Sequence, residues 1–160
     1  MRHLKLLILF LMVSCISVGQ QITSKDSIEI TNKINDWNKG WKQKDYKLTT
    51  QWYSDQAEFT NAFGHNMIGQ DSIETFMNHV FKLPFVMAGD SKVTGQKFIP
   101  LSEEIVLVVT SIERTGQQTN EGKELGIRKT THHRIFKMNK EWFIVAHLIS
   151  DARDTNSSNH

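Results

Sequence analysis

Four strand-like segments follow one another after Ser91 and fill most of the second half of the chain. Their apolar residues alternate with polar ones or form continuous runs, at residues 92–99, 104–113, 127–138 and 141–150. Consecutive strands joined by turns and polar loops pair antiparallel. The sequence therefore predicts an antiparallel sheet in this half of the chain.

Two helical segments begin the folded region. Between Ser24 and about Asp45, large apolar residues recur at three- and four-residue steps, at Ile28, Ile30, Ile34, Trp37 and Trp41. This spacing is typical of a helix with one buried face. Residues 46–53 are expected to form a short second helix.

A strand and a third helix lie between these helices and the predicted sheet. Residues 57–63 alternate between apolar and polar side chains up to Gly64, which predicts a strand. Asp71 is followed three residues later by Glu74, as in a capping box, and this predicts the start of a helix. Pro84 is expected to end that helix, because proline lacks the N–H group that a helix interior needs.

Helices followed by a run of strands predict an α+β fold, in which the helices pack on one face of a curved sheet. Apolar residues occupy both the odd and the even positions from Ile105 to Val109. A strand that is apolar on both sides needs a cover on each face of the sheet. Because the helices cover only one face, the sequence predicts a homodimer through the other.

The first 19 residues have the parts of a signal peptide. Arg2 and Lys5 supply the positive start, residues 6–13 form an apolar run, and Ser17–Gly19 supplies the small residues of a cleavage site. The apolar run is far shorter than the roughly 20 residues that span a bilayer, so we expect no transmembrane anchor. The protein is therefore expected to be exported, either to the periplasm or out of the cell.

Residues 12–15 offer an alternative to this cleavage, because they resemble a lipobox in which Cys15 would carry a lipid anchor. Cys15 is also the only cysteine, so the mature protein is expected to have no disulfide and no thiol nucleophile. A length of 160 residues predicts one domain, at residues 20–150, followed by a flexible polar tail at 151–160.

The charges of the mature chain balance. Lys and Arg number 19 against 17 Asp and Glu, and two of the basic residues, Arg2 and Lys5, belong to the leader. Proteins that bind nucleic acids depend mainly on clustered Lys and Arg, and this chain has no basic run. We therefore expect no nucleic-acid partner.

Residues 57–81, AEFTNAFGHNMIGQDSIETFMNHVF, resemble the SnoaL-like, SgcJ/EcaC-like branch of the nuclear transport factor 2-like superfamily. The matching positions are Phe59, Asn61, Gly64, Gly69, Ile73 and His79, with Ile34, Trp37, Trp41, Asp45 and Tyr53 upstream and residues 142–145 downstream. The resemblance implies a cone-shaped, curved sheet with the N-terminal helices on its concave face, around a deep apolar cavity. It also implies a dimer through the sheet, but not one particular reaction.

Two features depart from relatives in that superfamily. Leu148 stands where relatives often carry a histidine, and His147 lies one residue earlier. The positions of the ligand-binding arginines in the kinase association-domain relatives hold Thr110, His133 and Ile149 here. The resemblance therefore gives no support to carboxylate binding by an arginine cage.

Three histidines, His132, His133 and His147, form the most informative cluster. A two-residue turn at Asn139–Lys140 would place His132 opposite His147, whereas a three-residue turn would place His133 there. Lysine suits the positive φ of the tighter turn poorly, so the longer turn is favoured. His147 and His133 are the candidate acid and base, since imidazoles in an apolar cavity can move a proton. Burial is expected to keep at least one of them neutral.

Candidate ligand-binding residues combine aromatic rings with single polar groups. They are Trp41, Tyr53, Phe59, Asn61, Phe63, His79, His132, Phe143 and Val145. Phe143 and Val145 belong to this set because they alternate with His147 along the last strand. The alternatives are core packing for the aromatic residues, a backbone partner for Asn61 and solvent exposure for His79.

No motif indicates a metal or a cofactor. The chain has no His-x-His or His-x-x-x-His spacing, no glycine-rich phosphate loop and no serine elbow. We therefore expect neither a metal site nor a cofactor. Acid–base enzymes of this superfamily usually use a carboxylate whose pKa is raised by the cavity, and the candidates Asp55 and Asp151 are expected at the rims.

These features leave three hypotheses for the function. The first is an exported domain that binds a small apolar or aromatic molecule in its cone. The second is a cofactor-independent isomerase, cyclase or hydratase that uses the cavity histidines as acid and base. The third is a homo-oligomerisation module. The first is favoured, because no carboxylate is convincingly placed for catalysis.

Overall fold

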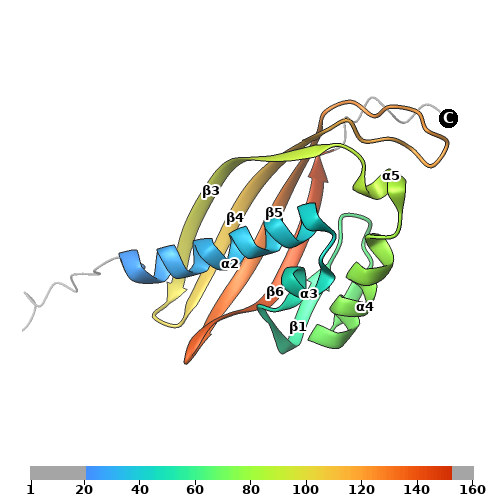
Figure 1. Cartoon of the computed structure of the whole chain (residues 1–160). Coiled ribbons are helices and arrows are strands. Elements are labelled where there is room, and N and C mark those ends of the chain that lie inside the picture. Colours follow the sequence, from blue (N-terminus) through green and yellow to red (C-terminus); the bar gives the residue numbers. More distant parts are fainter. Residues whose placement is uncertain (1–20, 153–160) are drawn as a thin grey trace, which may run out of the picture.

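The computed structural model describes residues 21–152 (Figure 1). The predicted signal peptide, Cys15 and most of the predicted tail lie outside the described residues. The elements follow in the order α2 (Ser24–Gln43), α3 (Tyr46–Thr50), β1 (Tyr53–Thr60), β2 (Asn66–Ile68), α4 (Gln70–Val80), α5 (Pro84–Met87), β3 (Asp90–Ser102), β4 (Ile105–Thr115), β5 (Arg128–Asn139) and β6 (Glu141–Ala152).

The strands form one sheet in the order β2-β1-β6-β5-β4-β3. The predicted antiparallel pairing is confirmed for β3 to β6, but β1 runs parallel to β6, so the sheet is mixed. A parallel pair needs a long connection, and here α4, α5 and four strands lie between β1 and β6. Figure 1 shows α2 lying across the concave face of the curved sheet, which confirms the predicted α+β fold.

Helix α2 forms where the apolar spacing predicts it. Thr23 caps its start, because its side chain accepts a hydrogen bond from the Asp26 N–H, and Lys44 ends it with a φ of 58°. Ile30, Ile34 and Trp37 are buried along one face. Ile28 was predicted on that face but is 62% exposed, because it lies about 200° around the helix from Ile30.

The start of α4 differs from the predicted capping box. Its N-cap is Gly69, whose φ of 87° suits glycine, and no side chain caps the helix. Asp71 therefore lies within the first turn instead of at the cap. Helix α4 ends at Val80, before Pro84, and Pro84 begins α5, where a missing N–H costs nothing.

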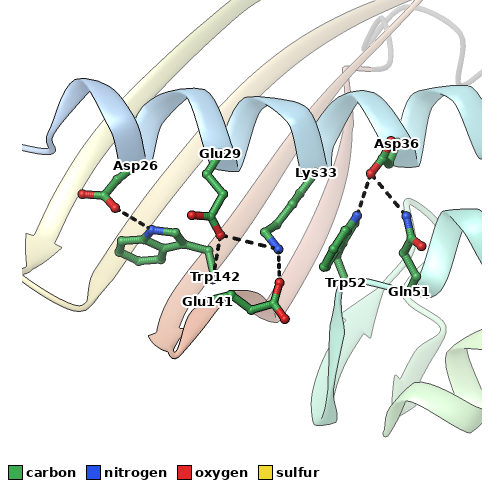
Figure 2. Close-up of polar contacts among 8 residues, drawn as sticks. All are labelled: Asp26, Glu29, Lys33, Asp36, Gln51, Trp52, Glu141 and Trp142. Carbon is green, nitrogen blue, oxygen red and sulfur yellow. Dashed lines mark hydrogen bonds and ion pairs between the residues drawn. The ribbon is translucent and has the colours of Figure 1, made fainter.

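A row of polar contacts fixes α2 against β6 and the start of β1 (Figure 2). The Lys33 ammonium donates to Glu141 at 2.8 Å and lies over the Trp52 ring, 3.3 Å from its centroid. On either side along the helix, Trp142 donates through its indole N–H to Asp26, and Trp52 donates to Asp36. These contacts set the rotation of α2, so that Trp37 faces the sheet.

Gly40 allows α2 and α3 to approach closely, and we expect the substitution Gly40→Ala to destabilise the fold. An added Cβ would lie 2.6 Å from the backbone nitrogen of Thr49 and 2.9 Å from the carbonyl oxygen of Asp45. Overpacking of this kind costs about 1–3 kcal/mol. Urea unfolding measures the loss. The matched control is Gly126→Ala, where nothing lies within 4 Å, and equal stability changes in the two variants would contradict the expectation.

None of the helices within residues 21–152 is both long and apolar enough to cross a membrane.

Candidate functional site

A cavity of about 350 Å³ lies between the concave face of the sheet, the C-terminal half of α2, and helices α4 and α5. Its walls are mainly apolar, with rings and aliphatic groups from Trp37, Trp41, Phe59, Phe76, Phe85 and Ile149. Volumes of this order suit a small organic molecule. Of the predicted ligand-binding residues, those that line the cavity are Trp41, Phe59, Asn61, Phe63, His79 and His132.

Three polar side chains at the base of the cavity form a buried network with Arg134. The Tyr53 hydroxyl lies 2.5 Å from His147 Nδ1, and His147 Nε2 lies 3.0 Å from His132 Nδ1. Arg134 Nη2 lies 3.1 Å from the same His132 nitrogen. No member is more than 5% exposed, and we call these four residues the histidine network. Of the four, only His132 lines the cavity.

Arg134 fixes the direction of every hydrogen bond in this network. A guanidinium can only donate, so His132 Nδ1 must accept and its ring proton must lie on Nε2. His147 Nε2 then donates to His132 Nδ1, and His147 Nδ1 accepts from the Tyr53 hydroxyl. The described residues provide no hydrogen-bond partner for His132 Nε2. The network therefore presents one N–H donor, on His132, to the cavity.

The network is electrically neutral apart from Arg134. Burial, reinforced by the charge on Arg134, lowers the pKa of both His132 and His147 well below the ordinary histidine value. Burial also raises the pKa of Tyr53, so its hydroxyl keeps its proton. The Trp37 ring packs edge-on against both imidazoles, with centroid distances of 5.4 and 5.8 Å.

A β-bulge changes the predicted pairing of the histidines. The turn has the longer form, with Met138 opposite Trp142, and Lys140 adopts a positive φ of 63°. The register then shifts at Val145, so that Arg134 lies opposite His147. An extra residue in one strand of a pair moves every later side chain to the other face.

This shift corrects three predicted site residues. His133 pairs with Leu148 and is only half-buried, so the partner of His147 is His132. Phe143 precedes the bulge and Val145 forms it. Neither residue therefore shares a face with His147, and neither lines the cavity. Tyr53 also lies outside the cavity lining, and it contributes through its hydroxyl in the network.

Asn61, Phe63 and His79 line the cavity from partly or largely exposed positions. Asn61 follows β1 in a turn, and its side-chain oxygen accepts from the backbone N–H groups of Phe63 and His65. The alternative of a backbone partner for Asn61 is therefore the one found. Phe63 is 63% exposed, and His79 is exposed on α4.

Sequence reasoning missed three arginines on the concave face. Arg114 and Arg128 line the cavity, and Arg134 is fully buried beneath it. The signal was present in the alternation, because all three occupy even positions, as do the buried Val108 on β4 and Phe136 on β5. The cavity is therefore lined by positive charge and by no acidic side chain from residues 21–152.

Within residues 21–152, no group of three or more His, Cys, Asp or Glu side chains is arranged to hold a metal ion.

Comparisons with known proteins identify the fold. No family model and no curated protein matches this chain. An uncharacterised protein with a cystatin-like fold from Caulobacter vibrioides matches with a TM-score of 0.73 and 11% identity, over 85% of this chain and 95% of its own. A ketosteroid isomerase-like protein from Erwinia carotovora matches with a TM-score of 0.66 and 11% identity, over 82% of this chain and 100% of its own.

An NTF-2-like protein of unknown function from Shewanella oneidensis is also similar, with a TM-score of 0.61 and 16% identity, over 78% of this chain and 98% of its own. The chain therefore has the cystatin-like fold of the nuclear transport factor 2-like proteins.

Proposed function

We propose that this chain is an exported small-molecule binding protein of the SnoaL-like branch, and that its ligand occupies the aromatic cavity. The observation that carries this proposal is the cavity itself, of about 350 Å³ with walls of Trp37, Trp41, Phe59 and Phe76. Large apolar walls with a few polar groups are typical of sites for small organic ligands. A module that served only for association would be expected to fill this space with its own side chains.

Native mass spectrometry of the protein purified from its own host tests the proposal. We expect a bound small molecule, which is absent after denaturation. The substitution Ile149→Trp would fill part of the cavity and should remove the bound molecule, whereas Ile28→Trp adds the same ring at an exposed position of α2 and should retain it. A wild-type protein without bound mass, or equal retention by both variants, would count against the proposal.

A second candidate function is acid–base catalysis by an isomerase, cyclase or hydratase. The histidine network supports it, because the network ends in the His132 N–H at the cavity and can polarise a carbonyl group there. The similarity to a ketosteroid isomerase-like protein also supports this second candidate. If the protein is an enzyme, the retained molecule should change chemically on incubation, and Tyr53→Phe should slow that change without releasing the molecule.

We also propose a homodimer through the sheet face opposite α2. The even positions of β4, such as Val106 and Val108, are buried under the helices, whereas Ile105, Leu107 and Val109 are half-buried on the other face. Leu107→Arg is therefore expected to give monomers in the same native mass spectra. Gln118→Arg, in the exposed loop after β4, is the control. If the Leu107→Arg protein is still a dimer, this face is not the dimer interface.

A further inference from the structure

Two arginines face each other across neighbouring strands at the wall of the cavity. Arg114 on β4 and Arg128 on β5 are direct register partners, and both line the cavity. Like charges directly opposite one another in a sheet are destabilising. We propose that the cavity binds an organic anion, a ring system with one carboxylate, and that Arg114 and Arg128 hold that carboxylate. This inference rests on the proposed binding function.

Arg114 is held in position by neutral groups only. Its Nη2 donates to the carbonyl oxygen of Val86 at 2.9 Å, and its guanidinium lies 5.2 Å from the centroid of the Trp41 ring. With the Gln117 amide oriented to accept, Gln117 receives a bond of 3.1 Å from Nη1. Burial and the charge on Arg128 lower the pKa of Arg114 to about 10, so it remains positive at neutral pH. No acidic side chain within residues 21–152 forms an ion pair with it.

Arg128 has an acidic partner, Asp151, which forms no ion pair with Arg114. Its Nε donates to Asp151 Oδ2 at 2.9 Å, and its guanidinium lies 5.4 Å from the centroid of the Phe63 ring. This wall therefore holds two guanidinium groups and one carboxylate, which forms its ion pair with Arg128. A planar carboxylate from a ligand would match the donor fork of an arginine and would offset the remaining positive charge.

The polar residues that continue along β5 indicate the shape of the ligand. Arg128, Thr130 and His132 share the cavity face, and Thr130 Oγ1 is buried without a hydrogen-bond partner among the described residues. The first and last of these are four residues apart, or about 13 Å along a strand. A ligand with its carboxylate at Arg128 could place a carbonyl or hydroxyl group at the N–H of His132. The cavity volume admits one or two rings between these ends.

The test uses two probes with the same ring system, the anionic 2-naphthoate and the neutral 2-naphthamide. Isothermal titration calorimetry at low salt measures the affinity of the wild-type protein for each. We expect naphthoate to bind at least about tenfold more tightly, because its carboxylate carries the charge opposite to that of the two guanidinium groups, whereas the amide is neutral. This comparison needs no variant, so it does not depend on the folding of one.

Variants then show which residues produce the preference for naphthoate over naphthamide. Arg114→Gln and Arg128→Gln should each bring the two affinities close together and leave that of naphthamide nearly unchanged. Lys129→Gln removes a charge from the same strand, at a side chain that is 66% exposed, and should keep the wild-type preference. Equal binding of the two probes by the wild-type protein would overturn the inference but not the proposed function. Binding of neither probe would count against both.

Discussion

The free energy of unfolding is expected to fall steeply as the pH drops below about 6.5, the ordinary pKa of histidine. Burial, with the charge on Arg134, lowers the pKa of His132 and His147 in the folded protein. Below pH 6.5 the unfolded chain binds protons at these residues and the folded chain does not, so acid favours unfolding. Each histidine that stays neutral contributes up to about 1.4 kcal/mol per pH unit. Urea unfolding at several pH values measures this slope.

Single substitutions assign the slope to the histidine network. His147→Gln removes one of the two groups and should reduce the dependence on pH, even if it lowers stability at every pH. His79→Gln removes an exposed histidine from α4 and should leave the slope as it is. A wild-type protein that is equally stable at about pH 7.5 and pH 5.5 would show that these imidazoles titrate normally in the fold.

Replacement of Arg134 by methionine is expected to stabilise the fold by about 1–4 kcal/mol. Arg134 is fully buried, its Nε and Nη1 have no hydrogen-bond partner, and no acidic side chain of residues 21–152 forms an ion pair with it. Its single side-chain bond is to His132 Nδ1, which would still accept from His147. Burial of a charge without an acidic partner is costly even with the Trp37 ring 4.9 Å from the guanidinium carbon, and methionine has a similar length without the charge.

Thermal and urea unfolding of Arg134→Met measure the change. Arg134→Lys keeps the charge and loses the planar donor, so it should be less stable than the wild-type protein. The pKa of His132 and His147 should rise in Arg134→Met, since the charge on Arg134 is one cause of their lowered values. A Met variant less stable than the wild type would show that the guanidinium supports the fold. The expected stabilisation would instead indicate that the charge is retained for the site.

Much of the fold follows from local patterns. The apolar spacing of α2 and the alternation along β3 to β6 depend on residues close together in sequence, and both predictions are confirmed. The parallel pairing of β1 with β6 joins residues such as Tyr53 and Ile144, which lie far apart in sequence. Local pattern carries no information on such a pair, so the mixed sheet could not be predicted from it.

The site was harder to predict, and one residue is the main reason. The sequence identified a histidine pair in the last hairpin, but Val145 forms a bulge that shifts the register after it. Bulges depend on tertiary packing, and the apolar run of residues 142–145 offers no local mark of one. The arginines could have been found, since Arg114, Arg128 and Arg134 continue the buried even positions of their strands. Arginine is mostly exposed in folded proteins, so residue type alone does not point to these positions.

A neutral histidine network presents the N–H of His132 to the cavity. Long-range ¹H–¹⁵N NMR spectra of the histidine rings test this arrangement. We expect His132 and His147 both to carry their proton on Nε2 and to stay neutral at about pH 6, and 2-naphthoate to shift the Nε2 signal of His132 more than the signals of His133. Free titration of His132 near pH 6.5, without a response to the probe, would show that the network does not exist in this form.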